Sequence, residues 1–243
     1  MITIDNSKTR AIVLQSIRYG DSSLIVKMLT EEFGLQSYMV KGVWGKNSKM
    51  KPAHFQNMNL LEIVDSSNKG SLHFIKDLSI SYFYKNIHSD FKKTSIIIFI
   101  SELISKSIID SDIDKTLFRF IYDSLIWLDE SESAAYINFP IIFAMKLCSY
   151  LGFSPNLETY QEGRLFDLLD GDFKSDSNSI HVIGNNLSTI FYNICKKGYE
   201  NYDINLSNSI RQQLLEAIVL YYKLHVENVK DIRSHEILHT ILS

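Results

Sequence analysis

Residues 9–51 constrain the fold most strongly, because they read as three short strands followed by a loop that is rich in lysine. The side chains of residues 11–18 alternate with a period of two, which is typical of a pleated strand rather than a helix. Turn residues at 19–22 and 31–34 end the first two strands, since Gly, Asp and Ser favour turn conformations. Strands are therefore predicted over 11–18, 24–29 and 35–43.

Two further strands are predicted over residues 55–64 and 72–80, with a turn between them at 65–70. Five short strands within about seventy residues, with no helix long enough for a crossover, predict a small antiparallel barrel. The OB fold is the leading five-stranded candidate. We therefore expect an N-terminal OB-fold domain over residues 1–80.

From residue 81 onward the periodicity changes to that of helices, with apolar residues three and four apart. Helices are predicted over 91–109, 113–128, 134–151, 187–197, 210–226 and 234–242. Pro140 should kink the third helix or move its start downstream, Asp112 is predicted to cap the second, and Ser207 or Asn208 the fifth. Residues 153–180 are predicted to be mostly irregular, with 165–168 extended. The expected fold is thus a two-domain α+β protein with an all-helical domain over 81–243.

Charge is segregated between the two halves, although the formal net charge is only −3. Residues 1–80 hold 10 Lys and Arg against 7 Asp and Glu, and the remainder holds 15 against 21. The positive half contains the loop at 41–51, which has four lysines and no acidic residue. Lysines can bind the phosphates of a nucleic acid, and a nearby tryptophan can stack on a base. The predicted nucleic-acid-binding residues are Arg10, Arg18, Tyr38, Lys41, Trp44, Lys46, Lys49 and Lys51. The glycine-punctuated turn after the third strand is expected to free the loop lysines to follow a flexible DNA backbone.

Short segments along the chain, taken in order, carry a family resemblance. In the first half these are Thr9-Arg10-Ala11, Tyr19-Gly20-Asp21-Ser22-Ser23, Glu31-Glu32-Phe33-Gly34 and Lys41-Gly42. In the second half they are Gly152-Phe153-Ser154-Pro155-Asn156-Leu157, Phe166-Asp167-Leu168 with Gly171, Leu214-Leu215, Tyr221-Tyr222, His225, and Arg233-Ser234 with Glu236-Ile237-Leu238. Together these segments resemble the RecO family of bacterial recombination mediators, and the resemblance covers nearly the full length, roughly Thr9 to Leu242.

This resemblance implies an OB-fold N-terminal domain and a protein without catalytic activity. It implies binding to single- and double-stranded DNA, and annealing of complementary strands covered by single-strand binding protein. It also implies work with RecR to load RecA, and recognition of the acidic, phenylalanine-ended tail of single-strand binding protein through the helical domain. The candidate residues for that last contact are Lys196, Lys197, Arg211 and Lys223.

One departure from the family concerns zinc. Many members hold a zinc ion through four cysteines after the Gly-x-x-Pro segment, but residues 153–184 contain no cysteine here. Cys148 and Cys195 lie outside this region, in apolar helical patterns, and are predicted to be buried free thiols. We therefore expect no zinc and no other cofactor, with packing around residues 166–168 in its place.

Two alternatives remain open. His235, Glu236 and His239 match H-E-x-x-H, which on a helix places two zinc ligands and a general base on one face. The chain ends too soon for the usual third ligand, so a zinc hydrolase is the weaker alternative. The other is a helical protein-interaction adaptor with a purely structural barrel. No P-loop, G-x-G-x-x-G or G-x-S-x-G motif occurs, so if the protein remodels nucleoprotein, we expect it to do so without an ATPase of its own.

No secretory signal is visible, and the apolar residues 96–109 are interrupted by Glu102 and Lys106. The window is too short to span a bilayer. The expected location is cytoplasmic, at the nucleoid, with no membrane partner.

Overall fold

The computed structural model describes residues 6–66, 72–108, 112–132, 134–176, 178–197, 204–229 and 231–242. The chain forms two compact units. The first comprises Met1–Lys85 and Ile108–Asp129, and the second comprises Asn86–Ser107 and Glu130–Ser243. Among the described residues, no helix combines the length and apolar character needed to cross a membrane.

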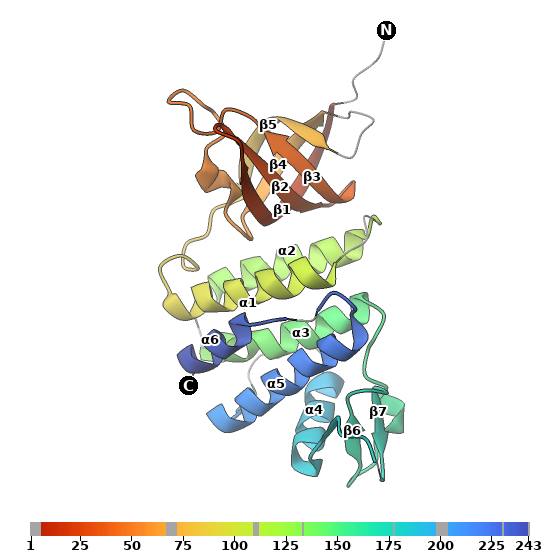
Figure 1. Ribbon diagram of the computed structural model, residues 1–243. Helices are drawn as coiled ribbons and strands as arrows, with labels where there is room; N and C mark the ends of the chain where they lie inside the picture. The colour runs from red at the N-terminus through yellow and green to blue at the C-terminus, as the bar shows by residue number, and fades with distance from the viewer. Residues whose placement is uncertain are drawn as a thin grey trace. The chain divides into compact units, whose positions relative to one another are not determined.

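The first unit is built on a closed barrel of five strands, which confirms the predicted OB-like barrel (Figure 1). The strands are β1 (Asn6–Tyr19), β2 (Ser23–Thr30), β3 (Gly34–Val40), β4 (Leu60–Ser66) and β5 (His73–Tyr82). They are neighbours in the order β1-β2-β3-β5-β4. Every neighbouring pair with a ladder is antiparallel except β3 and β5, which close the barrel through a short parallel seam. This is a Greek-key closure of the kind found in OB folds.

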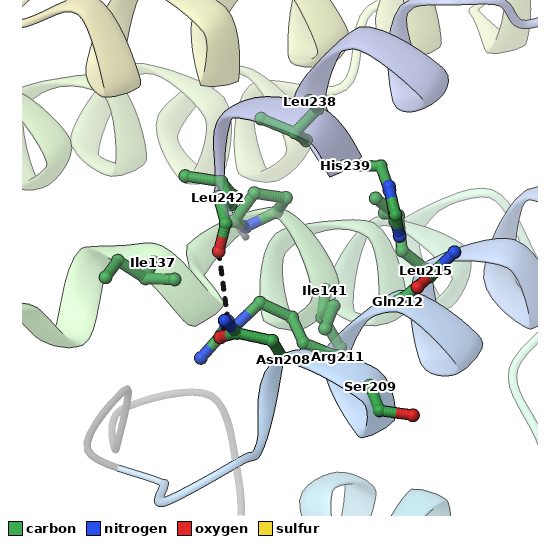
Figure 2. Close-up of a pocket in the computed structure, with 11 residues that line it drawn as sticks. Ile137, Ile141, Asn208, Ser209, Arg211, Gln212, Leu215, Leu238, His239 and Leu242 are labelled. Carbon is green, nitrogen blue, oxygen red and sulfur yellow. Dashed lines mark hydrogen bonds between the residues drawn. The ribbon is translucent and has the colours of Figure 1, made fainter.

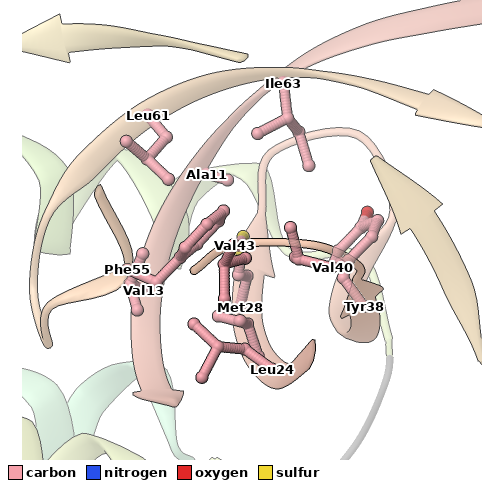
Figure 3. Packing of buried hydrophobic residues seen from close by; sticks show 11 residues of the cluster. Ala11, Val13, Leu24, Met28, Tyr38, Val40, Val43, Phe55, Leu61 and Ile63 are labelled. Atoms are coloured by element: carbon pink, nitrogen blue, oxygen red, sulfur yellow. The ribbon is translucent and has the colours of Figure 1, made fainter. Parts of the chain in front are cut away.

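Alternate residues of the strands fill the barrel with apolar side chains (Figure 3). On β2, Leu24, Val26 and Met28 are buried, while the residues between them are half-buried. A bulge after Val13 shifts the register of β1 against β2. Because strand side chains alternate between faces, the period of two in the sequence delivers this core directly.

The connection into β4 differs from the prediction of one continuous strand over residues 55–64. A turn of 3-10 helix, η1 (Pro52–Phe55), comes first, and β4 begins after it. Met58 has a φ of 65°, in the left-handed region, and its N–H donates to the carbonyl of Val13 at 2.6 Å. The Asn59 side-chain amide donates to two carbonyls of the helical turn. Apolar residues are therefore buried here by a turn, which periodicity alone does not distinguish from a strand.

Helix α2 (Lys115–Glu130) lies mostly within the barrel unit, although the sequence analysis placed it in the second domain. The guanidinium of Arg10 covers the rings of Phe118 and Tyr122, at 5.6 and 4.7 Å from their centroids. The Tyr82 hydroxyl donates to Asp129 Oδ2 at 3.0 Å. The predicted domain boundary after residue 80 therefore leaves α2 out of the unit to which it belongs. A helical spacing of apolar residues indicates that one face of the helix is buried, but it does not indicate which hydrophobic core that face joins.

The second unit is helical, as predicted, and it also contains a small three-stranded sheet that the sequence analysis did not include. Its helices are α1 (Phe91–Ser107), α3 (Phe139–Tyr150), α4 (Asn185–Lys197), α5 (Asn208–His225) and α6 (Ser234–Ile241), with 3-10 turns η2 (Ala134–Asn138) and η3 (Leu157–Thr159). The sheet has β6 (Leu165–Asp167) between β7 (Asp172–Lys174) and β8 (Val182–Ile183). Strands of two or three residues are too short to give an alternating pattern, so this stretch read as largely irregular.

The helix ends follow the sequence signals with one exception. Asp114, and not Asp112, caps α2 by accepting hydrogen bonds from two backbone N–H groups of the first turn, at 2.9 Å each. Ser207 caps α5, as one of the two predicted alternatives. Pro140 lies in the first turn of α3, so it moves the start of that helix downstream.

Aromatic side chains hold the small sheet against the neighbouring helix. The Phe166 ring centroid lies 4.8 Å from that of Phe173 and 4.6 Å from that of Phe191 on α4. Tyr160 stacks on Tyr192 with centroids 3.6 Å apart. These ring contacts supply the packing that the sequence analysis expected around residues 166–168.

Candidate nucleic-acid interface

The loop over residues 41–51 leaves β3 with a frame of backbone hydrogen bonds. Gly42 has a φ of 69°, and its carbonyl accepts from the N–H of Gly45 at 3.1 Å. An added Cβ on Gly45 would lie 3.2 Å from that carbonyl oxygen, so the turn has little room for a side chain. The N–H of Val43 donates to the Ser22 carbonyl at 3.0 Å, and the Val43 side chain is buried in the barrel core. The loop is thus attached to the turn between β1 and β2.

Lys51 holds the far end of this loop. Its Nζ donates to the carbonyl oxygens of Gly45 at 2.7 Å and Lys46 at 3.0 Å. The ammonium therefore donates to the loop backbone, and a phosphate contact by Lys51 stays a prediction. A lysine that reaches back five and six residues has no local motif that would reveal it.

Three other loop lysines, Lys41, Lys46 and Lys49, are exposed. Within the described ranges none of the three forms an ion pair with a carboxylate. The Lys41 ammonium lies 5.1 Å from the centroid of the Phe74 ring on β5, a residue that the sequence analysis did not predict as part of the site. An ammonium that lies over an aromatic ring can still be hydrated on the side away from the ring. The charges of Lys41, Lys46 and Lys49 are therefore available to a polyanion.

Trp44 and Arg18 meet at the same end of the barrel. The Trp44 side chain is 51% exposed, and Arg18 Cζ lies 5.5 Å from the centroid of its ring. Arg18 and Tyr19 precede the β1–β2 turn, and Tyr19 is 54% exposed. The structure thus brings together much of the predicted site, which we call the basic rim: Arg18, Tyr19, Lys41, Trp44, Lys46 and Lys49.

Tyr38 was predicted as a nucleic-acid contact, and this prediction is wrong. Its side chain is buried inside the barrel (Figure 3), and its ring packs edge-on against His73. Positions 38 and 40 of β3 share the interior face, because side chains two apart in a strand point the same way. Burial raises the pKa of the Tyr38 hydroxyl.

Arg10 was also predicted to contact nucleic acid, but its guanidinium is bound within the barrel unit. Nε and one terminal nitrogen donate to the two carboxylate oxygens of Glu31, both at 2.8 Å. This fork raises the pKa of Arg10 and lowers the pKa of Glu31. The charge of Arg10 is therefore offset by Glu31, which argues against a phosphate contact at this position.

A buried polar pair near the closing seam was not predicted from the sequence. Asp65 on β4 is 2% exposed, and one of its oxygens lies 3.3 Å from His73 Nδ1. Its other oxygen has no hydrogen-bond partner in the described part of the chain. Burial raises the pKa of Asp65, partly offset by His73.

The four predicted partner-binding cations of the second unit do not form one site. Lys196 is exposed and lies over the Tyr192 ring at 5.4 Å, and Lys223 is exposed on α5. Lys197 ends α4, and its side chain lies outside the described residues. Arg211 alone lines a cavity.

This cavity, of about 190 Å³, lies among α3, α5 and α6 and is lined largely by apolar side chains (Figure 2). The Arg211 guanidinium donates to Asn138 and Asn208 side-chain oxygens at 3.2 and 2.8 Å, and to the carbonyls of Leu206 and Leu242 at 3.0 and 3.3 Å. All four acceptors are neutral, and desolvation lowers the Arg211 pKa. A half-buried cation whose partners among the described residues are all neutral, beside an apolar cavity, favours a ligand with an apolar body and an anionic group.

The H-E-x-x-H residues lie on α6. His235 is half-buried with its Nδ1 unpartnered among the described residues, and desolvation lowers its pKa. Glu236 is exposed, while His239 lines the cavity. Over the ranges that the structure describes, no three His, Cys, Asp or Glu side chains gather as metal ligands. The zinc-hydrolase alternative therefore gains no third ligand. Both cysteines are free, with Cys148 buried and Cys195 half-buried.

The barrel, its basic rim and the helical second unit define a two-domain protein of the OB-like class. The family model described as Recombination protein O N terminal matches residues 1–84, and the one described as Recombination protein O C terminal matches residues 88–234. The chain therefore belongs to the RecO family of DNA repair proteins.

Individual relatives agree with this assignment along nearly the full length. The chain is 34% identical to DNA repair protein RecO of Flavobacterium psychrophilum over 239 residues, which cover 97% of this chain and 99% of that protein. It is 32% identical to DNA repair protein RecO of Azobacteroides pseudotrichonymphae, over 96% and 98% of the two chains. It is 30% identical to DNA repair protein RecO of Bacteroides fragilis, over 95% and 97%.

Proposed function

We propose that this chain is a non-catalytic, DNA-binding recombination mediator that acts at the nucleoid in the cytoplasm. In this proposal it anneals complementary single strands, and it helps RecR to load RecA onto DNA covered by single-strand binding protein. The observation that carries the DNA-binding part is the basic rim, with exposed lysines unpaired by carboxylates on a preformed loop. Membership of the RecO family supports the remaining steps.

Salt dependence tests the rim directly. Each lysine on a phosphate releases condensed counterion, so log K falls with log salt by about 0.7 per contact on single strands. Replacing both Lys46 and Lys49 with alanine should flatten that slope by about 1–1.5 units. Lys196→Ala, an exposed lysine of the second unit, is the matched control and should keep the slope. A wild-type slope in the double variant would place the DNA path elsewhere, and an absence of salt-dependent binding would favour the structural-barrel adaptor.

We also propose that the Arg211 cavity receives the acidic, phenylalanine-ended tail of single-strand binding protein. The apolar lining suits a terminal Phe side chain, and the guanidinium, whose four described acceptors are neutral, suits its carboxylate. The net negative charge of residues 81–243 disfavours binding of an acidic peptide over a broad surface of this half. Binding is therefore expected at a local cation, and Arg211, whose described partners are neutral, is such a cation.

Fluorescence anisotropy with the full chain and a labelled peptide of this kind tests the second proposal. Because Arg211→Met removes four hydrogen bonds and could prevent folding, Ser209→Glu is the sharper variant. Ser209 is exposed in the first turn of α5 and lines the cavity, where an acidic residue suits the helix dipole but repels the peptide. Ser209→Glu should weaken binding about tenfold, while Ser209→Ala should not. Equal binding by both variants would contradict the assignment.

A further inference from the structure

Trp44 is an exposed aromatic side chain on a backbone that is fixed on both sides. The residue before it, Val43, is buried in the barrel and hydrogen-bonded to the Ser22 carbonyl. The residue after it, Gly45, closes a tight turn onto Gly42 and accepts a hydrogen bond from Lys51. A ring presented in this way needs little further ordering when a ligand binds, which favours affinity.

Only one face of the Trp44 ring has a charged partner. Arg18 lies against it at 5.5 Å from the centroid, and within the described ranges no other ring or cation is placed on the indole. With 51% of the side chain exposed, the remaining face is open to solvent. The same loop carries exposed lysines at positions 41, 46 and 49, so an exposed aromatic ring and several cations share one short segment.

A nucleobase whose phosphates are held by neighbouring lysines is the ligand that fits a free indole face in this setting. In a duplex the faces of the bases are covered by their own stacking, whereas an unpaired base can be splayed onto an aromatic side chain. Lysine contacts to phosphate do not depend on pairing in this way. We propose that Trp44, backed by Arg18, makes the basic rim select single-stranded over double-stranded DNA. The inference rests on the proposed DNA binding and adds the strand class that the site prefers.

The size of the effect follows from stacking. One stacked base contributes about 1–3 kcal/mol by alanine substitution, which is about 5- to 150-fold in affinity. Trp44→Ala should therefore weaken binding of an oligothymidylate within that range and leave a blunt duplex of the same length within about twofold. Trp44→Phe should recover part of the loss, because a smaller ring still stacks. The salt slope should stay the same in both variants, since stacking displaces no counterion.

Tryptophan fluorescence gives a second, direct measurement. The chain has two tryptophans, so the Trp44 signal is the difference between the wild type and Trp44→Phe. Oligothymidylate should quench this signal, and an abasic strand of the same length, which keeps the phosphates but lacks bases, should bind without quenching it.

The possible outcomes distinguish a failure of the strand-selecting role of Trp44 from a failure of the proposed DNA binding by the basic rim. If Lys46 and Lys49 control the salt slope but Trp44→Ala weakens single strand and duplex equally, or weakens neither, the strand-selecting role is wrong and the DNA-binding proposal stands. Equal quenching by the abasic strand would overturn the stacking role as well. If no DNA binds in a salt-dependent way, both proposals fail.

Discussion

Replacing Arg10 with methionine should destabilise the protein without changing the salt dependence of DNA binding. Charge-assisted hydrogen bonds contribute about 1.5–3 kcal/mol when buried, and exposed ion pairs less than about 1 kcal/mol. The Arg10 and Glu31 side chains are 36% and 13% exposed, so their fork lies between these limits, near about 1.5 kcal/mol. The contacts with Phe118 and Tyr122 add about 0.5 kcal/mol. A total loss of about 2 kcal/mol lowers Tm by about 4–8 °C for a chain of this size.

Thermal unfolding followed by circular dichroism measures this loss, and a pH series tests its cause. The pKa of Glu31 is lowered in the fold, so its contribution is present above the unfolded value near about 4 and is lost as pH falls through the folded value. The difference between wild type and Arg10→Met should therefore shrink below about pH 4. Arg119→Met, which removes a longer contact of 3.6 Å to Glu31, should cost less than about 0.5 kcal/mol. Unchanged stability together with a slope reduced by about 0.7 would refute the reasoning and return Arg10 to the DNA interface.

Three further predictions follow from other contacts. Lys51→Met should weaken single-strand binding by about 0.5–1 kcal/mol through loss of loop order, with the salt slope unchanged. Lys49→Met should instead lower the salt slope by about 0.7. The reverse result would make Lys51 the phosphate contact and Lys49 the residue that orders the loop. Asp65→Asn should stabilise the protein by about 1 kcal/mol at pH 7, measured by thermal unfolding. The pKa of Asp65 is raised in the fold, so its contribution to stability is present below the unfolded pKa near about 4 and is lost as pH rises through the folded pKa. A wild-type protein whose stability does not fall over that pH range would count against this prediction. The purified protein should carry no stoichiometric zinc and keep its Tm in chelator, and one tightly held zinc per chain by elemental analysis would disprove this.

The barrel and most helices could be predicted because burial on one face leaves a regular trace in the sequence. The strands β1 to β3 came directly from a period of two, and Pro140 marked the start of α3 through its missing N–H. The spacing of apolar residues predicted α2 as a helix, but it could not indicate whether α2 packs on the barrel or belongs to the helical unit. In the small sheet, the extended stretch that became β6 was predicted, but β7 and β8 were missed because strands of two or three residues are shorter than the period that would reveal them.

The candidate site was predicted at the level of the segment but not of each residue. Tyr38 and Trp44 are both aromatic residues near the lysines, yet Tyr38 lies on the interior face of β3, whereas Trp44 lies in the turn after β3 has ended, where strand alternation no longer applies. Arg10 and Arg18 lie on the same strand, but only Arg10 meets a carboxylate, Glu31, from a distant turn. Such long-range partners decide whether a cation is free, and they leave no local signal.

The assignment of α2 to the barrel unit has a consequence for how this protein can be divided. The chain passes between the two units three times, after Lys85, after Ser107 and after Asp129. A fragment ending near residue 84 keeps every strand of the barrel but loses Phe118 and Tyr122, the rings that Arg10 covers, and should expose apolar surface and aggregate. No single genetic crossover can exchange one unit for that of a relative without separating the barrel from its helix. The two halves are therefore expected to have been inherited together, as one module rather than as interchangeable parts.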